Sequence, residues 1–244
     1  MAMKVTLFIQ CIVDSVFPKV GQSMVRVLDR LGVSMDYPED QTCCGQPAFN
    51  SGYRGEARDA AKRFIEIFED AETIVCPSGS CVDMVRNHYV DLFEKDSKWL
   101  ERARLVAEKT FEFSEFLVDV LKVEDVGASF AQRVTYHDSC HLMRGIGVSR
   151  QPRKLISNVK DIDFVEMHDA DRCCGFGGTF SFKYPGISTA MLEDKVRNIE
   201  TSEAQVVVGC DMGCLMNIQG MLSRKNINIK TMHIAELLDH DTHT

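Results

Sequence analysis

The sequence predicts an α/β fold of two pseudo-repeated domains, each an open parallel sheet with flanking helices. Two observations predict it. The ten cysteines fall into two matching groups of five about 130 residues apart, which indicates an internal duplication. Short β-branched or aromatic runs alternate with segments of helical apolar spacing, as in parallel sheets joined by crossover helices. We place the first domain at residues 1–128 and the second at residues 129–244.

The cysteine pattern is the same in both halves. Each group has a lone cysteine, then an adjacent pair that continues into glycine, then a closely spaced pair. The first group is Cys11, Cys43, Cys44, Cys76 and Cys81, and the second is Cys140, Cys173, Cys174, Cys210 and Cys214. The closing pair encloses four residues in the first half and three in the second. The first half also has about 13 extra residues, which we place in the charged stretch 94–109.

Four strands are expected in each half. They are residues 5–10, 33–37, 73–75 and 110–113 in the first half, and residues 134–136, 164–167, 206–208 and 227–230 in the second. We expect a helix between the first two strands that ends at Gly32. Its apolar face consists of Val20, Met24, Val27, Leu28 and Leu31. The next helix has the same spacing at Ala57, Ala61, Phe64, Ile65 and Phe68.

The lone and closing cysteines stand where a strand ends and a helix begins, and each Cys-Cys-Gly segment follows another strand. The carboxyl ends of parallel strands share one edge of the sheet, where open α/β folds bind ligands. Helix N-termini point to the same edge, and their partial positive charge favours thiolates. We therefore expect the five cysteines of each half to gather at a site that faces the cleft between the domains.

Composition narrows the classes of protein. The formal net charge is −8 and the pI is about 5.4, which argues against nucleic-acid binding, since that needs a basic face. No apolar run approaches the ~20 residues that span a bilayer, so we expect no membrane span. The apolar stretch before Cys11 is too short for a signal peptide, and we expect a cytoplasmic protein.

Four interpretations of the cysteines compete. Structural disulfides fit poorly, because no secretion signal is present and adjacent cysteines bond only through a strained ring. Zinc usually takes four ligands from two short C-x-x-C-like turns, and a Cys-Cys pair with a fifth cysteine matches that poorly, although zinc in one site stays open. Thiol redox chemistry is the third interpretation. Iron–sulfur ligation is favoured, because a multi-iron cluster takes several thiolates, and the duplication predicts one cluster in each half.

Several motifs resemble those of one family. They are Cys43-Cys-Gly-Gln-Pro-Ala-Phe, Cys76-Pro-Ser-Gly-Ser-Cys81, Tyr136-His-Asp-Ser-Cys140-His and Cys173-Cys-Gly-Phe-Gly-Gly. They resemble the cysteine-rich CCG family, which includes the heterodisulfide reductase B subunit, the glycerol-3-phosphate dehydrogenase C subunit and the lactate-utilisation A-type iron–sulfur proteins. The similarity is greatest to the last group and covers nearly the whole chain.

The resemblance implies a cytoplasmic electron-transfer subunit of an L-lactate-oxidising complex. Two further subunits would complete that complex, and electrons would pass to a quinone or another carrier. The resemblance also implies that all ten cysteines are cofactor and metal ligands, with one [4Fe–4S]-type iron–sulfur cluster in each repeat.

Two other functions stay open at this point. One is a catalytic subunit of the disulfide or heterodisulfide reductase type, and the other is a zinc-stabilised scaffold. The heterodisulfide reductase motif closes with C-x-x-C, whereas both closing pairs here are longer. The sequence therefore leaves open whether Cys81 and Cys214 ligate, and which type of cluster is bound.

Two histidines flank Cys140 and are the candidate catalytic residues. His137 precedes it by three residues and His141 follows it directly, whereas the first half has Phe8 and Ile12 at these offsets from its lone cysteine. Either histidine can hydrogen-bond cluster sulfur, replace a ligand or transfer a proton. The alternative is a structural histidine at the start of a helix.

Overall fold

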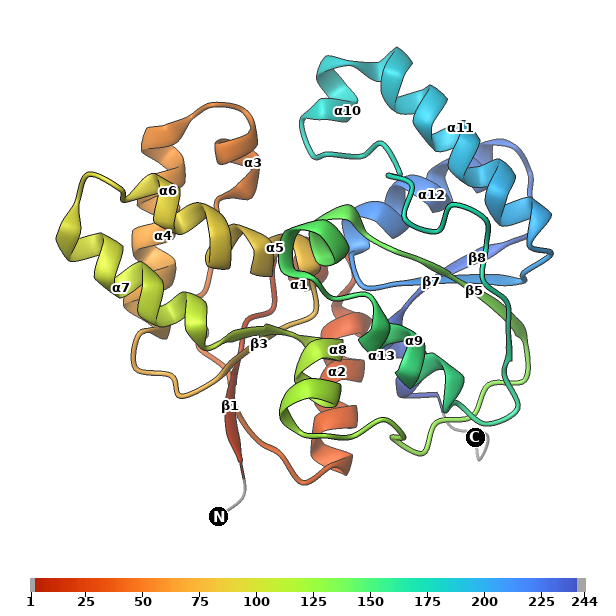
Figure 1. The fold of residues 1–244 in the computed structure, drawn as a ribbon, viewed down its shortest axis with the longest axis horizontal. Coiled ribbons are helices and arrows are strands. Elements are labelled where there is room, and N and C mark those ends of the chain that lie inside the picture. The colour runs from red at the N-terminus through yellow and green to blue at the C-terminus, as the bar shows by residue number, and fades with distance from the viewer. Residues whose placement is uncertain (1–2, 241–244) are drawn as a thin grey trace.

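The computed structural model describes residues 3–240 and confirms the predicted α/β class (Figure 1). Each half has one four-stranded parallel sheet, and the strand order is the same in both: β2-β1-β3-β4 and β6-β5-β7-β8. The strands are β1 (Lys4–Leu7), β2 (Ser34–Asp36), β3 (Ile74–Cys76), β4 (Thr110–Glu112), β5 (Arg133–His137), β6 (Asp163–Phe164), β7 (Val206–Gly209) and β8 (Lys230–His233). The matching order follows from the duplication seen in the cysteines.

Three predicted strands differ from the observed ones by three residues at one end or both. The strand expected at residues 164–167 is β6, which ends at Phe164. The strand expected at residues 5–10 ends at Leu7, and the Ile9 amide donates to the Gln41 side chain at 2.7 Å instead of to a neighbouring strand. The strand expected at 227–230 begins only at Lys230. Ile227 and Ile229 pack against the core beside it, so their apolar character serves burial and not strand pairing.

The helices of the first half are α1 (Cys11–Val16), α2 (Pro18–Arg30), α3 (Gln46–Asn50), α4 (Arg54–Phe68), α5 (Gly79–Asp83), α6 (Tyr89–Leu92), α7 (Ser97–Glu108) and α8 (Phe113–Glu115), with π-helical turns η1 (Met84–His88) and η2 (Phe116–Val120). Those of the second half are η3 (His141–Gly145), α9 (Arg150–Ser157), α10 (Phe180–Lys183), α11 (Pro185–Thr201), α12 (Met212–Arg224) and α13 (Ile234–Leu238). Both predicted amphipathic helices are present, as α2 and α4, and their apolar faces are buried. The extra residues of the first half form α7, which packs over its core through Ala103 and Val106.

The two halves share one large apolar core. It includes strand residues of both sheets, among them Val5 and Val75 of the first and Val134 and Val206 of the second. The last helix of each half packs against the first long helix of the other: α13 against α2, and α8 with η2 against α9. This exchange holds the carboxyl edges of the two sheets beside each other.

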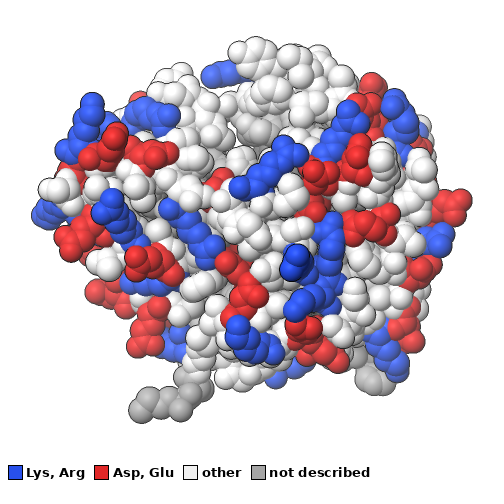
Figure 2. All heavy atoms as spheres, viewed as in Figure 1, with Lys and Arg blue, Asp and Glu red and all other residues white. Residues whose placement is uncertain are grey.

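The surface is of mixed charge on the face that Figure 2 shows. Acidic and basic side chains alternate over most of that face, and few charged side chains lie on its upper part, between α3 and α10. In residues 3–240, no helix combines the length and the apolar character that crossing a bilayer requires.

Candidate metal centre

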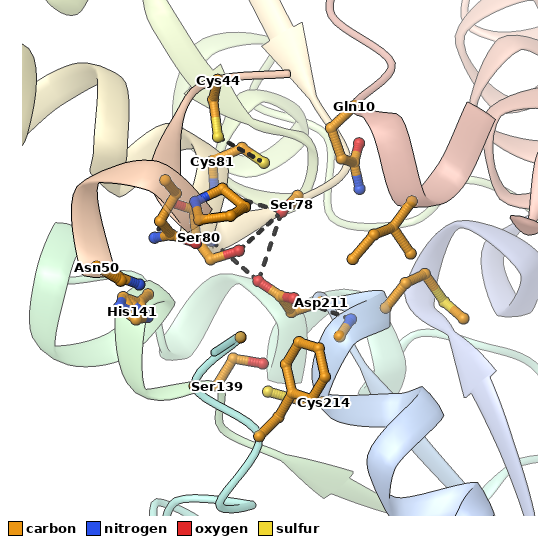
Figure 3. Close-up of a pocket in the computed structure, with 18 of the residues that line it drawn as sticks. Gln10, Cys44, Asn50, Ser78, Ser80, Cys81, Ser139, His141, Asp211 and Cys214 are labelled. Atoms are coloured by element: carbon orange, nitrogen blue, oxygen red, sulfur yellow. Dashed lines mark hydrogen bonds between the residues drawn. The ribbon is translucent and has the colours of Figure 1, made fainter. Parts of the chain in front are cut away.

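One cavity lies between the two halves, at the carboxyl ends of their strands. Its volume is about 150 Å³, enough for several water molecules, so the side chains around it enclose a real space. Figure 3 shows Cys44 and Cys81 on one side of it, Cys214 on the other, and Asp211 between them. Eight of the ten cysteines line this cavity: Cys11, Cys43, Cys44, Cys81, Cys140, Cys173, Cys174 and Cys214. The structure therefore brings four cysteines of each group to one cavity, while Cys76 and Cys210 do not line it.

Four of these cysteines are held at the starts of helices, as the sequence predicted. Cys11 is the first residue of α1, and Cys140 directly precedes η3. Cys81 and Cys214 each lie in the first turn of a helix, in α5 and α12. Free backbone amides and the positive end of the helix dipole there stabilise thiolates.

The other four are the two adjacent pairs, and the glycine after each pair is required by the backbone. Gly45 has φ of +85° and Gly175 has φ of +79°, a conformation that glycine adopts without strain. The turn lets the glycine amide donate to the thiol two residues earlier, Cys43 or Cys173, at 3.4 Å in both halves. The Cys-Cys-Gly motif is thus a tight turn that presents two thiols to the cavity.

Each turn is also tied to a neighbouring helix. The carbonyl of Cys44 accepts a hydrogen bond from the Tyr89 hydroxyl at 2.9 Å, and that of Cys174 accepts one from the Asn217 side chain at 3.0 Å. Different residues in the two halves therefore hold the same carbonyl. In the second half Asn217 lies on α12, the helix that also presents Cys214, whereas in the first half Tyr89 begins α6.

Replacing Gly175 with alanine is expected to destabilise the second turn by about 1–3 kcal/mol beyond a matched control. An added Cβ would meet the backbone oxygen of Ser188 at 2.6 Å, which requires the turn to move. Gly178 is the control, since it also has a positive φ, +59°, but a Cβ there meets nothing within 4 Å. Urea unfolding of Gly175→Ala and Gly178→Ala measures the difference, and equal stability of the two would contradict a role for close packing.

The thiols of the first half form a hydrogen-bonded chain. Hydrogen bonds from the Cys11 and Cys44 thiols, opposed by burial and aided by the Gly45 amide, lower the pKa of Cys43 to about 3. Hydrogen bonds to Cys43 and Cys81, together with burial, raise the pKa of Cys44 well above its usual value. The Sγ atoms of Cys44 and Cys81 are 3.5 Å apart. These thiols can share one or two negative charges, and full ionisation needs a cation.

The second half repeats this chain. Hydrogen bonds from the Cys140 and Cys174 thiols lower the pKa of Cys173 to about 2. Hydrogen bonds to Cys173 and Cys214, followed by burial, raise the pKa of Cys174 well above its usual value. Cys43 and Cys173 therefore have the same thiol neighbours and a similarly lowered pKa in the two halves.

Cys76 and Cys210 are the two cysteines that do not line the cavity. Both are fully buried. Cys76 lies behind the first site, where its thiol interacts with that of Cys81 and is 3.9 Å from the Gln10 side-chain oxygen. Cys210 lies in the shared core, and its Sγ atom is 3.5 Å from the hydroxyl oxygen of Tyr136. The two closing pairs are therefore alike in sequence but not in position.

The two candidate histidines occupy different environments. His141 lines the cavity, with Nδ1 3.9 Å from the Cys140 Sγ atom and Nε2 4.0 Å from a carboxylate oxygen of Asp83. His137 is fully buried, and burial, with a smaller effect of Lys195, lowers its pKa to about 3. Its imidazole is therefore neutral, and a ring nitrogen lies within 4.8 Å of the Cys174 and Cys214 thiols.

Sequence reasoning missed Asp211, which joins the halves at the cavity. Its carboxylate accepts hydrogen bonds from the Ser80 amide at 3.0 Å, the Ser78 hydroxyl at 3.4 Å and the Gly213 amide at 3.2 Å (Figure 3). An Asp before a helix is a recognisable capping signal, but the contact with the other half is not visible in the sequence.

The donors present fit an iron–sulfur cluster. All ten cysteines are free thiols, and eight of them face one space. No Lys or Arg is found among the residues of the 3–240 range that line it, so thiolates there need positive charge from a bound metal. The thiols exceed the four that zinc takes, whereas several thiolates around more than one iron are the usual ligation of such clusters.

Comparison with known proteins identifies the family. The sequence profile named CCG, a cysteine-rich domain, matches twice, at residues 5–86 and 134–219, and each match contains one complete group of cysteines. The chain belongs to the CCG family. This confirms the resemblance found from the motifs, and the two matches agree with an internal duplication of the CCG domain.

Curated relatives match the CCG chain over nearly its whole length. It is 51% identical to lactate utilization protein A of Bacillus subtilis (strain 168) over 97% of this chain and 99% of that protein. It is 48% identical to lactate utilization protein A 2 of Bacillus cereus (strain 03BB102) over 97% and 98%. Among solved structures, a hypothetical protein from Helicobacter pylori matches with a TM-score of 0.60 at 10% identity, over 96% of this chain and 48% of that one. The CCG chain thus spans about half the length of that protein, and the likeness is one of fold.

Proposed function

We propose that this chain is the iron–sulfur electron-transfer subunit of an L-lactate-oxidising complex, with one [4Fe–4S]-type cluster in each half. The observation that carries the proposal is the gathering of eight thiols, from both repeats, around one cavity. Relatives named lactate utilization protein A support a role in lactate use. Two further subunits would complete the complex, and a quinone or another carrier would accept the electrons through them.

The residues of this chain have distinct tasks in the proposal. A bound cluster supplies one-electron oxidation and reduction. The cysteines hold it, and the amides of Gly45 and Gly175 donate to thiol sulfur, which stabilises negative charge on the ligands. Ile12, Phe176 and Met212 also line the cavity, and their apolar side chains limit the access of water.

His141 is the better candidate of the two histidines for moving protons. About a third of its side chain is exposed, and it is close to the Cys140 thiol. His137 has no exposed surface, so it cannot exchange protons directly with solvent. We therefore propose that any proton transfer coupled to the redox step passes through His141.

A cytoplasmic location is part of the same proposal. Ten free cysteines in one chain support it, because thiols stay reduced in that compartment. The boundary between a domain of residues 1–128 and one of residues 129–244 stays a prediction. The sheets fall on either side of it, and the large apolar core includes residues from both sides.

Metal and sulfide analysis tests the proposal most directly. Protein purified without oxygen from iron-supplied cells is expected to contain about eight iron atoms and as many acid-labile sulfides per chain, four for each half. Its visible absorption should bleach when lactate is added together with the two partner subunits. Zinc without sulfide would contradict the proposal and support a scaffold. Reoxidation by a disulfide substrate, with no response to lactate, would instead support the reductase function.

A further inference from the structure

The two closing cysteine pairs differ in spacing by one residue, and this difference reverses the direction in which one cysteine side chain points. Cys81 and Cys214 occupy the same position, the third residue of α5 and of α12. Counted back from there, the counterpart of Cys76 is Gly209, and Cys210 stands one residue further along. Side chains alternate between the two faces of a strand, so a shift of one residue reverses the face. Cys210 therefore points away from the side to which Cys76 points.

The pairing of the strands gives the same correspondence independently. Leu7 and Tyr136 both stand four residues before the lone cysteine of their half, and they pair with Val75 and Val208. The residue that follows on the strand is a cysteine in the first half and Gly209 in the second. The second half thus has no side chain at the position of the fifth thiol.

The surroundings of the two cysteines confirm their opposite orientation. Cys76 belongs to the core cluster that contains Cys44 and Cys81. Cys210 belongs to the core shared by the halves, together with Tyr136, whereas Cys214 belongs to a third cluster. A thiol on the far face of the strand cannot reach the second site without a change of the backbone.

His137 has a possible metal-binding nitrogen on the face of the sheet to which Cys210 does not point. It pairs with Gly209 across the neighbouring strand, and in a parallel ladder paired residues project to the same face. It stands three residues before the lone cysteine, where the first half has Phe8, a residue packed against Phe64 and Phe68. A donor therefore replaces a purely apolar ring in the same half in which glycine replaces a cysteine.

The imidazole of His137 lacks any other partner. Both ring nitrogens are buried and make no hydrogen bond with the residues described, 3–240. Leaving such a group unsatisfied destabilises the folded state, so buried polar groups in native proteins nearly always have a partner. The thiols of Cys174 and Cys214 lie within 4.8 Å of a ring nitrogen, a spacing at which one metal can bind all three. A bound metal would give one of these two ring nitrogens the partner that it lacks.

We propose that His137 is a metal ligand of the second site in place of a fifth thiol, and that Cys210 is not a ligand. The inference rests on the proposed function, since it assigns the donors of one of the two clusters. The first site then has Cys11, Cys43, Cys44, Cys76 and Cys81, and the second has Cys140, Cys173, Cys174, Cys214 and His137. A neutral imidazole in place of a thiolate makes the second site more positive by one charge. Its reduction potential is therefore higher than that of the first site.

Pulsed electron paramagnetic resonance of the reduced wild-type protein tests the ligand itself. The protein is produced in cells supplied with either natural-abundance or ¹⁵N-labelled histidine. One cluster is expected to show a coupling to a nitrogen nucleus, and this coupling should change with the isotope. The coupling should persist in His141→Gln and disappear in His137→Cys, which keeps a ligand atom but removes the nitrogen. His137→Cys should also retain its iron and lower the potential of one cluster.

Iron content separates the two cysteines. Cys210→Ala is expected to keep all the iron of the wild type, whereas Cys76→Ala, its matched control, loses up to half. His137→Phe, which copies the first half, should also lose up to half and leave the signal of the first cluster intact as a check of folding. The inference is overturned if the wild type has both clusters and no histidine coupling, or if Cys210→Ala loses iron and His137→Phe does not. A wild type without iron and sulfide would overturn the proposed function as well.

Discussion

Replacing Cys43 with serine is expected to remove the metal from the first site and to stop electron transfer through the chain. Cys43 stands between Cys11 and Cys44 in the hydrogen-bonded chain of thiols, and its pKa is lowered to about 3, so it is a thiolate at neutral pH. A serine hydroxyl does not ionise in this range and is a poor ligand for iron. We expect iron to fall by about half and lactate oxidation by the assembled complex to fall on the order of 100-fold or more.

Cys173→Ser is the matched variant in the second half and should behave in the same way, because Cys173 has the same neighbours and the same lowered pKa. Met216→Leu is the control, since Met216 is partly exposed on α12 and does not line the cavity. Iron, sulfide and lactate-dependent bleaching are measured on all three proteins. Full iron and full activity in both serine variants would show that Cys43 and Cys173 are not ligands.

The fold was predictable because the same pattern of strands, helices and cysteines occurs in both halves of the sequence. The alternation of strands and helices is visible in short apolar runs such as residues 73–75 and 206–208, and each observation in one half has a counterpart in the other. The exchange of the terminal helices was not predictable. That α13 packs against α2 of the other half, as well as against α9 of its own, depends on the distance and angle between the two sheets, and local patterns do not contain that information.

The site was predictable in its place but not in its detail. Cysteines at the ends of parallel strands must share an edge, and eight of them do face one cavity. The orientation of Cys210 follows from a shift of a single residue between the strand and α12. Sequence patterns do not locate the end of a strand to within one residue, so this orientation could not be predicted. The unequal closing pairs were the visible signal, and strand pairing was needed to interpret them. The contacts of Asp211 with the other half are long-range and leave no local pattern.

Removal of the Asp211 carboxylate is expected to have the largest effect on stability of any change at the cavity outside the cysteines. The side chain is only 7% exposed, and it accepts from the amide of Ser80 and the hydroxyl of Ser78 in the other half. It also caps α12 through the amide of Gly213. Truncation leaves these donors without a partner at the junction of the two halves, where water has little access.

Asp211→Ala should therefore lower the free energy of unfolding by about 3 kcal/mol, the combined effect of a lost cap and of buried donors left unsatisfied. Asp211→Asn is the comparison variant. Ser78 and Ser80 donate to one carboxylate oxygen and Gly213 to the other, so the single amide oxygen of asparagine keeps only part of these bonds, and we expect it to cost about 1 kcal/mol. Urea unfolding of the metal-free, reduced chain measures both without interference from a bound cofactor. Because the lost contacts join the halves, the alanine variant should also unfold less cooperatively, with a lower dependence on urea concentration. If Asp211→Ala were as stable as the wild type, the contact between the halves would be held by their shared apolar core alone.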